Sequence, residues 1–246
     1  MQHRPMPRAI WGFAFIVRPW LMMLTKRDWQ GLENLPAEGG YVLAPNHVSH
    51  LDPILLGHFL YDQDLPPRFL AKDTLFGVPG LGRLMRAARQ IPVYRTEPGA
   101  AAESVRDACA AVEAGEVVTV YPEGTITRDP LGWPMTGRTG AVRIALMTGR
   151  PLIPLMQSGA QEILWPYTKM PKLIPRKTIH VRVGPALDLS EFTGQPLTDE
   201  VLHGATERLM DTLTAMMAEL RGELPTGPRI DVRTLRSRAT NQSLEG

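Results

Sequence analysis

Residues 41–53 read YVLAPNHVSHLDP, and this stretch decides the predicted fold. Its first part, 41–46, is an apolar run of strand length, as expected for a strand buried on both faces. Its last part is Asp52-Pro53, where an N-cap Asp followed by Pro at the first helical position predicts the start of a helix. A buried strand, a short loop and a helix are therefore expected in direct succession.

The same alternation continues along the chain. Further apolar runs predict buried strands at 68–72, 91–95, 117–122, 152–156 and 179–183. Helical patterns lie at 101–114, at 139–148 and from Thr198 onward, and Gly115 and Gly149 are predicted helix stops. This order predicts an α/β fold, a single domain with a largely parallel mixed sheet flanked by helices.

The two ends of the chain differ from this domain. Residues 1–27 contain five Lys or Arg and no acid, and the apolar stretch 9–24 is interrupted by Arg18 and Pro19. As a helix it would extend about 24 Å, short of a hydrocarbon core of ~30 Å. We predict a membrane-interfacial amphipathic segment over 1–29, a domain over 30–222 and a polar, mobile tail over 223–246. The alternative that the first segment is a helix packed on its own domain remains open.

Composition excludes several classes. Apolar residues make up 43% and charged residues 21%, which excludes a wholly disordered chain and a polytopic membrane protein. The single cysteine, Cys109, excludes an intramolecular disulfide and a Cys-rich zinc site. A net charge of +2 gives no indication of nucleic acid as a partner, and we expect none.

His47 and Asp52 form the first candidate site. His47 follows the predicted strand at 41–46, and a turn would let the Asp52 carboxylate orient one ring nitrogen while the other faces a substrate. A purely structural N-cap role for Asp52 and a loop histidine without function remain open alternatives. No G-x-S-x-G, P-loop or H-E-x-x-H motif is present, so neither Ser49 as a nucleophile nor a metal is expected. The pair predicts a base that deprotonates the substrate's own hydroxyl.

Other candidates follow neighbouring strands. Glu123 and Gly124, in the stretch 121–125 (YPEGT), would supply a carboxylate and a tight turn. Arg95 and Lys72 come at strand ends and suit a phosphate. Taken singly, the stretch 121–125 could equally be an ordinary turn, and Arg95 and Lys72 could equally be solvated surface cations. Trp133 and Trp165 are expected in the core rather than in an acyl groove.

These segments together resemble the glycerolipid acyltransferase family, most closely the 1-acylglycerol-3-phosphate acyltransferases. The family is marked by an N-H-x(4)-D block, here 46–52, and by a block that opens near a Lys and ends on an Arg, here 72–95. An (F/Y)-P-E-G-T block, here 121–125, and an apolar block with prolines, here 151–154, complete the pattern. The resemblance covers about half of the chain.

The resemblance implies roles for these residues. His47 would be the general base and Asp52 its partner. The acceptor's phosphate would be bound by Arg95 with help from Lys72, and its glycerol by Glu123, Gly124 and Thr125. Two positions depart from the family's pattern: Arg128 lies two residues later than the expected Arg, and Arg138 replaces a Lys before the following helix. Arg128 either takes over the anion contact from its shifted place or leaves that contact missing.

The implied reaction moves a fatty acyl group from acyl-coenzyme A or acyl carrier protein to the free sn-2 hydroxyl of 1-acylglycerol-3-phosphate, giving phosphatidic acid. No cofactor beyond this co-substrate is expected. The implied partners are a lysophospholipid, an acyl thioester and a membrane surface, with a peripheral or monotopic location on its cytoplasmic face. Open alternatives are another lysophospholipid or a glycolipid as acceptor, a thioesterase, and a non-catalytic lipid-binding protein.

Overall fold

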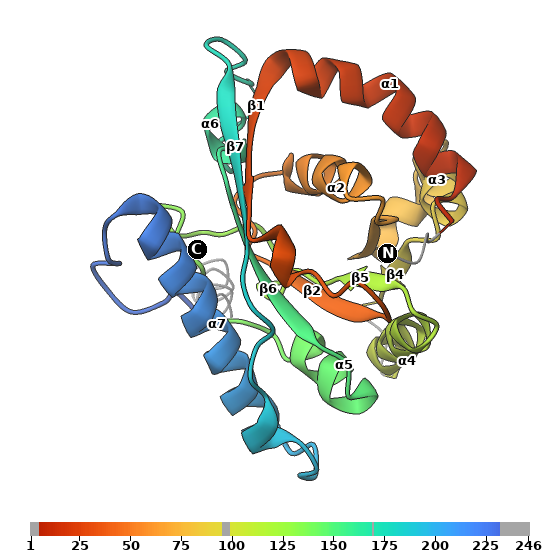
Figure 1. The fold of residues 1–246 in the computed structure, drawn as a ribbon, viewed down its shortest axis with the longest axis vertical. Coiled ribbons are helices and arrows are strands. Elements are labelled where there is room, and N and C mark those ends of the chain that lie inside the picture. The colour runs from red at the N-terminus through yellow and green to blue at the C-terminus, as the bar shows by residue number, and fades with distance from the viewer. Residues whose placement is uncertain (1–4, 95–98, 169, 232–246) are drawn as a thin grey trace, which may run out of the picture.

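The computed structural model describes residues 5–94, 99–168 and 170–231. The strands form one seven-stranded sheet in the order β1-β7-β6-β2-β5-β3-β4 (Figure 1). Neighbouring strands are parallel except β6 and β7, which are antiparallel. Their bounds are β1 Thr25–Gln30, β2 Tyr41–Pro45, β3 Arg68–Lys72, β4 Ile91–Val93, β5 Val117–Thr119, β6 Leu152–Ser158 and β7 Lys177–Val183. The predicted α/β domain with a largely parallel, mixed sheet is confirmed.

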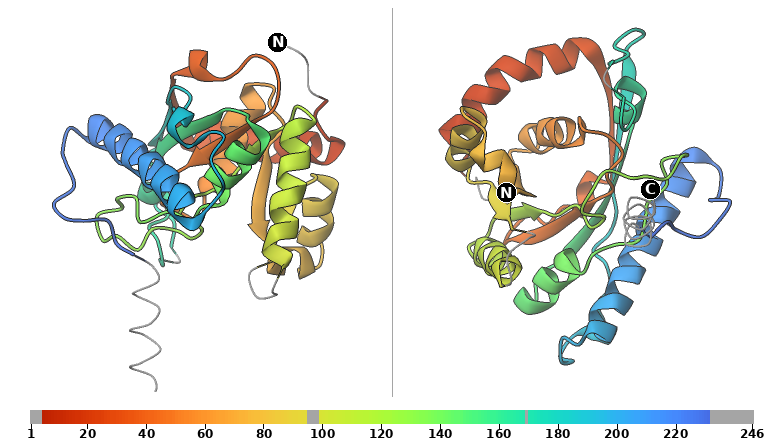
Figure 2. Two further views of the ribbon diagram at one scale, coloured as in Figure 1. Left: turned by 90° about the horizontal axis from the view of Figure 1, so that it is seen from below. Right: turned by 180° about the vertical axis from the view of Figure 1, so that it is seen from behind.

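Helices cover both faces of this sheet (Figure 2). Their bounds are α1 Arg8–Leu24, α2 Asp52–Asp62, α3 Leu81–Ala87, α4 Ala100–Glu113, α5 Gly140–Thr148, α6 Ala160–Ile163 and α7 Asp199–Arg221. Short 3-10 turns η1 Leu32–Asn34, η2 Asp73–Gly77 and η3 Ser190–Phe192 lie in connections. Sequence analysis missed α3 and α6, which are short, but predicted the other helices of the domain.

Strand β2 lies at the centre of two cores. Val42 and Ala44 pack with buried residues of α4, α5 and α7. Tyr41 and Leu43 pack with buried residues of α2 on the other face. Successive side chains of a strand point to opposite faces, so a strand that is buried on both faces must be apolar at every position. This explains why the run at 41–45 has no polar alternation.

Strand β1 is a finding that the sequence did not predict. Its residues, TKRDWQ, show no apolar run, and β1 is an edge strand paired only with β7 among the described residues. Residues 25–29, predicted as part of the N-terminal segment, therefore belong to the sheet. The domain begins at Thr25 rather than at residue 30.

Helix α1 lies on the same side of the sheet as α2 and passes over α2 on its outer side (Figure 1). Its inward residues recur at helical spacing and line a cavity: Ile10, Phe13, Ala14, Val17, Arg18 and Leu21. Its outward side chains include Trp11, Phe15, Ile16 and Trp20, all exposed. Within the described residues, no helix is long and apolar enough to cross a membrane.

The chain after Gly222 differs in part from the predicted mobile tail. Arg229 forms ion pairs with Glu207 and Asp211 of α7, and the carbonyl of Ile230 accepts a hydrogen bond from the Thr136 amide. The ion pairs connect residues 18 or more positions apart, so the local polar composition did not reveal them. The rest of the predicted tail, 232–246, lies outside the described residues.

Candidate active site

The site begins where β2 leaves the sheet at Asn46. The Asn46 side chain is buried and is held by Gln157 of β6: Oδ1 accepts from the Gln157 amide at 2.7 Å, and Nδ2 donates to the Gln157 carbonyl at 3.0 Å. Nε2 of Gln157 in turn donates to the Asn46 carbonyl at 2.8 Å. These bonds fix the point from which the next residue, His47, projects. Sequence analysis missed Gln157, although a polar residue directly after the apolar run at 152–156 was a usable signal.

The structure brings His47 and Asp52 together. Nδ1 of His47 lies 2.8 Å from Oδ2 of Asp52, and the same oxygen accepts hydrogen bonds from the amides of Val48 at 2.6 Å and Ser49 at 2.7 Å. Asp52 is fully buried. Because Nδ1 faces the carboxylate, Nε2 is the ring nitrogen left for a substrate.

The predicted N-cap role of Asp52 is wrong. Leu51 occupies the N-cap position of α2, with no side-chain capping bond, and Asp52 is the first helical residue. Its carboxylate turns back to the preceding loop instead of forward to the helix amides. Ser49 is likewise occupied: its buried hydroxyl donates to the Leu164 carbonyl at 2.7 Å, so it stabilises the loop and is not presented as a nucleophile.

Glu123 supports the same loop from the turn that follows the neighbouring strand β5. Its Oε1 accepts from the His47 amide at 2.8 Å, and its Oε2 accepts from the Met135 amide at 3.1 Å. Burial raises the pKa of Glu123 to about 8, an effect that these two amide bonds only partly offset. Both carboxylate oxygens thus bind backbone, and Glu123 is absent from the cavity lining. Its role as a ligand of the acceptor stays a prediction.

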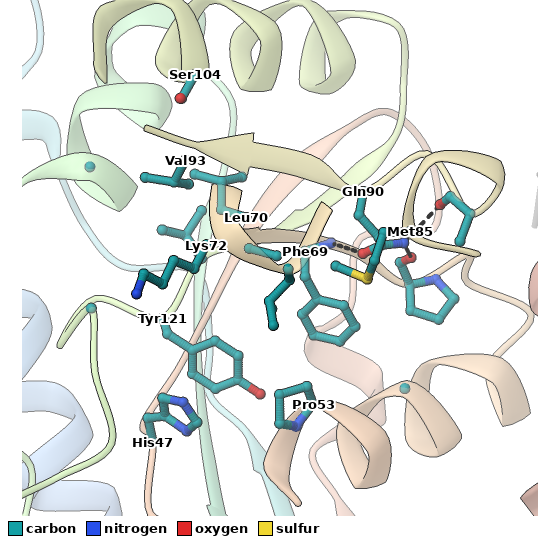
Figure 3. Close-up of a pocket in the computed structure, with 18 of the residues that line it drawn as sticks. His47, Pro53, Phe69, Leu70, Lys72, Met85, Gln90, Val93, Ser104 and Tyr121 are labelled. Carbon is teal, nitrogen blue, oxygen red and sulfur yellow. Dashed lines mark hydrogen bonds between the residues drawn. The ribbon is translucent and has the colours of Figure 1, made fainter. Parts of the chain in front are cut away.

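Tyr121 packs directly on the candidate base. The rings of His47 and Tyr121 are stacked with centroids 4.2 Å apart, and Phe69 stacks on the other side of Tyr121 at 6.3 Å (Figure 3). Burial raises the pKa of the Tyr121 hydroxyl well above its ordinary value, so it stays neutral. Together with the Asp52 bond, the stack restricts the His47 ring to one plane.

A cavity of about 1460 Å³ opens beside His47. One part of its wall is mainly apolar and comes from α1, α2 and α3, where Arg18 of α1 is paired with Asp62. Another part is cationic: Lys72 lies at the end of β3, Arg106 on α4, Arg138 just before α5 and Arg143 on α5. Figure 3 shows Lys72 projecting from its strand above Tyr121 and His47. A long apolar chain and an anionic group can therefore occupy one continuous space next to the imidazole.

Of the other predicted site residues, some line the cavity and others do not. Gly124 and Thr125 line the cavity, and Gly124 adopts φ 67° with the Arg138 side chain against it, so an added Cβ would meet Cδ of Arg138 at 2.7 Å. Arg128 is exposed and does not line the cavity. Arg95 lies outside the described residues. Sequence analysis missed Arg106 and Arg143, whose helical positions alone gave no signal.

The two tryptophans considered for an acyl groove lie in different surroundings. Trp133 is buried in a core cluster, as predicted, but Trp165 is exposed, and neither lines the cavity. Among the described residues, no cluster of three or more His, Cys, Asp or Glu could hold a metal ion.

Comparisons with known proteins show which family the chain resembles. The family model Acyltransferase matches residues 26–158, more than half of the chain. The 1-acyl-sn-glycerol-3-phosphate acyltransferase of Bacillus subtilis is 29% identical over 177 residues, which cover 72% of this chain and 81% of that protein. The Borreliella burgdorferi protein of the same name is 25% identical over 182 residues, covering 73% and 70%.

A solved structure shares the fold. The crystal structure of the 1-acyl-sn-glycerophosphate acyltransferase PlsC from Thermotoga maritima superposes with a TM-score of 0.65 at 20% identity, covering 89% of this chain and 81% of that one. The matched family segment, residues 26–158, includes His47, Asp52 and Glu123 together with β2 to β6 and all but the first residue of β1. The chain belongs to the acyltransferase family.

Proposed function

We propose that the protein transfers a fatty acyl group from an acyl thioester, on coenzyme A or acyl carrier protein, to the free sn-2 hydroxyl of 1-acylglycerol-3-phosphate. The observation that carries the proposal is one cavity that combines an apolar wall, a cationic wall and an imidazole held by a carboxylate. Relatives named for this reaction support it.

In the proposed mechanism, Nε2 of His47 takes the proton from the acceptor hydroxyl. The resulting alkoxide attacks the thioester carbonyl and forms the new C–O bond. The tetrahedral intermediate collapses, the C–S bond breaks, and the thiolate receives the proton from His47. Asp52 stabilises the imidazolium between these steps. Such general-base assistance is typically worth about 10²–10⁴ in rate.

The cations that face the cavity suit the acceptor's phosphate. Lys72 and Arg143 are the proposed ligands, together with Arg138 beside the Gly124 turn. Arg95, at the end of the sequence block 72–95 that opens near Lys72, remains a proposed ligand because of the family pattern. The apolar wall under α1 suits a fatty acyl chain, since burying each CH₂ contributes about 0.8 kcal/mol.

We also propose that the enzyme is peripheral or monotopic on the cytoplasmic face of a membrane. The aromatic side chains on the outside of α1 and the excess of cations in residues 1–27 support this location. Acceptor and product are both membrane lipids, so a surface-bound enzyme meets them without extracting them fully into water.

The decisive experiment measures thiol release from acyl-coenzyme A with and without 1-acylglycerol-3-phosphate, and detects phosphatidic acid. We expect release that depends on the acceptor, and a His47→Ala variant with kcat lower by at least about 10³, or about 4 kcal/mol. His203→Ala, an exposed histidine on α7, is the matched control. Thiol release without acceptor would indicate a thioesterase, and no release with this or any other lysolipid acceptor would indicate a lipid-binding protein.

A second acceptor class is favoured by one observation. Arg128, the cation nearest in sequence to the family's Arg after E-G-T, is exposed and away from the cavity. A site without that contact suits a lysophospholipid with a larger head group or a glycolipid. A panel of lysolipids at equal concentration distinguishes these acceptors, because the preferred one gives the highest kcat/KM.

A further inference from the structure

The loop between α6 and β7, residues 164–176, exposes an unusual set of apolar side chains. Ile174 is 90% exposed and Met170 82% exposed, and Trp165, Tyr167 and Leu173 are also exposed. Single exposed apolar residues are normal on a protein surface, but several on one short loop indicate a contact surface. None of these residues lines the catalytic cavity.

The charge of this loop indicates which partner it would contact. Residues 164–176, LWPYTKMPKLIPR, contain three Lys or Arg and no acidic residue, and Lys177 follows as the first residue of β7. Aromatic and aliphatic side chains beside cations match the boundary of an anionic bilayer, where rings and alkyl stems enter the head-group region and cations meet lipid phosphates.

The loop is continuous with the outside of α1. Nη2 of Arg176 donates to the carbonyls of Met22 and Thr25, each at 2.7 Å, and so connects the end of the loop to the end of that helix. Figure 1 shows this loop and the C-terminal end of α1 at the same extremity of the molecule. Trp20 and Met23, near that end of α1, are exposed as well. Loop and helix thus extend one apolar face.

The start of the loop is held by the catalytic site. The Leu164 carbonyl accepts from the hydroxyl of Ser49, which lies between His47 and Asp52, and the Tyr167 hydroxyl donates to the Ile126 carbonyl at 3.4 Å. The apolar side chains are therefore presented from a backbone that is fixed to the domain at both ends. A surface held in this way can set the height of the active site above a lipid plane.

We propose that the α6–β7 loop is a second lipid-contact element, which docks together with the outer face of α1 on an anionic bilayer. This inference rests on the proposed membrane location of the enzyme. It adds a contact that is remote from α1 in sequence, and it orients the molecule by two elements instead of one.

The test uses the full chain and sedimentation with vesicles of phosphatidylcholine, with and without phosphatidylglycerol. Met170→Ser combined with Ile174→Ser should weaken binding to the mixed vesicles about 10- to 100-fold, since two exposed apolar side chains lose their contact with lipid. The matched control is Leu224→Ser, at an apolar residue 79% exposed beyond α7, which should bind as the wild type does. Lys172→Glu should weaken binding to the mixed vesicles and leave binding to pure phosphatidylcholine unchanged.

Each failure has a distinct meaning. If the wild type does not bind either vesicle, the proposed membrane location fails, and this inference fails with it. If the wild type binds and the Met170/Ile174 variant binds equally well, the location stands and the loop has no part in it. Light scattering that shows a dimer in the wild type and a monomer in the variant, with equal vesicle binding, would make the loop an interface between copies and overturn the inference.

Discussion

Replacing Asp52 by Asn tests whether the charge of this carboxylate, as distinct from its hydrogen bonds, supports catalysis. Nδ1 of His47 and the amides of Val48 and Ser49 all meet Oδ2. The other oxygen, Oδ1, is buried and has no hydrogen-bond partner in the part of the chain that the structure describes. An asparagine can therefore place its carbonyl oxygen at the Oδ2 position and accept the same three bonds.

The expected magnitudes follow from this geometry. The new NH₂ group would be buried at the Oδ1 position without an acceptor, which lowers the free energy of unfolding by about 1–3 kcal/mol. Removing the negative charge next to the imidazolium should lower kcat by about 10²–10⁴, or about 2.7–5.5 kcal/mol of transition-state stabilisation. Asp52→Ala would instead leave the Val48 and Ser49 amides unpaired, at a cost of about 2–6 kcal/mol in stability.

The assay combines thiol release at saturating acyl-coenzyme A and acceptor with urea unfolding of each variant. We expect Asp52→Asn to remain folded and to lose kcat with little change in either KM. An Asp52→Asn variant that keeps more than about a tenth of the wild-type kcat would refute the reasoning, because the charge would then contribute less than about 1.4 kcal/mol. Loss of activity that simply follows unfolding in both variants would reduce Asp52 to a structural residue.

Four further substitutions probe the rest of the site. Between the ordinary pKa of about 4.5 and the raised pKa of about 8, the folded chain keeps a proton on Glu123 that the unfolded chain loses, so stability falls as the pH rises. Urea unfolding of wild type and Glu123→Gln at pH 5 and pH 8 should show the variant gaining relative stability at the higher pH, and a constant difference would contradict the raised pKa. Gly57 lines the cavity, where an added Cβ would meet only Pro67 at 4.0 Å. Gly57→Leu should therefore lower kcat/KM for long acyl donors about tenfold relative to short ones, because the new side chain would displace about two methylenes of the acyl chain from the cavity. An unchanged dependence of kcat/KM on chain length would show that the acyl chain does not pass Gly57. Lys72→Ala and Arg95→Ala should each raise KM about tenfold for a phosphate-bearing acceptor and much less for the donor; equal effects on both substrates would refute a phosphate contact.

The sequence pattern was sufficient for the order of the six strands β2 to β7 and of the longer helices α2, α4, α5 and α7, but not for β1, α3 or α6. The run at 41–45 is apolar at every position because β2 is covered on both faces, and this is a property of local composition. The proximity of His47 and Asp52 was also predictable, since a loop between a strand and a helix leaves five residues little freedom to separate. Edge strand β1 has no such pattern, because it gains its place from pairing with β7 about 150 residues later.

The roles of individual polar groups depended on contacts that no local pattern encodes. Gln157 holds Asn46 across 111 positions of sequence, and Glu123 binds the amide of His47 across 76. A buried carboxylate accepts hydrogen bonds from whichever backbone amides nearby lack another partner. Only the folded chain therefore decides whether such a carboxylate caps a helix, holds a loop or faces a substrate. The amino-acid sequence alone thus determined the fold class and the identity of the candidate base. The tertiary structure decided which side chains reach the cavity beside that base, because such convergence results from the packing of α4 and α5 on the sheet and of α1 over α2 and α3.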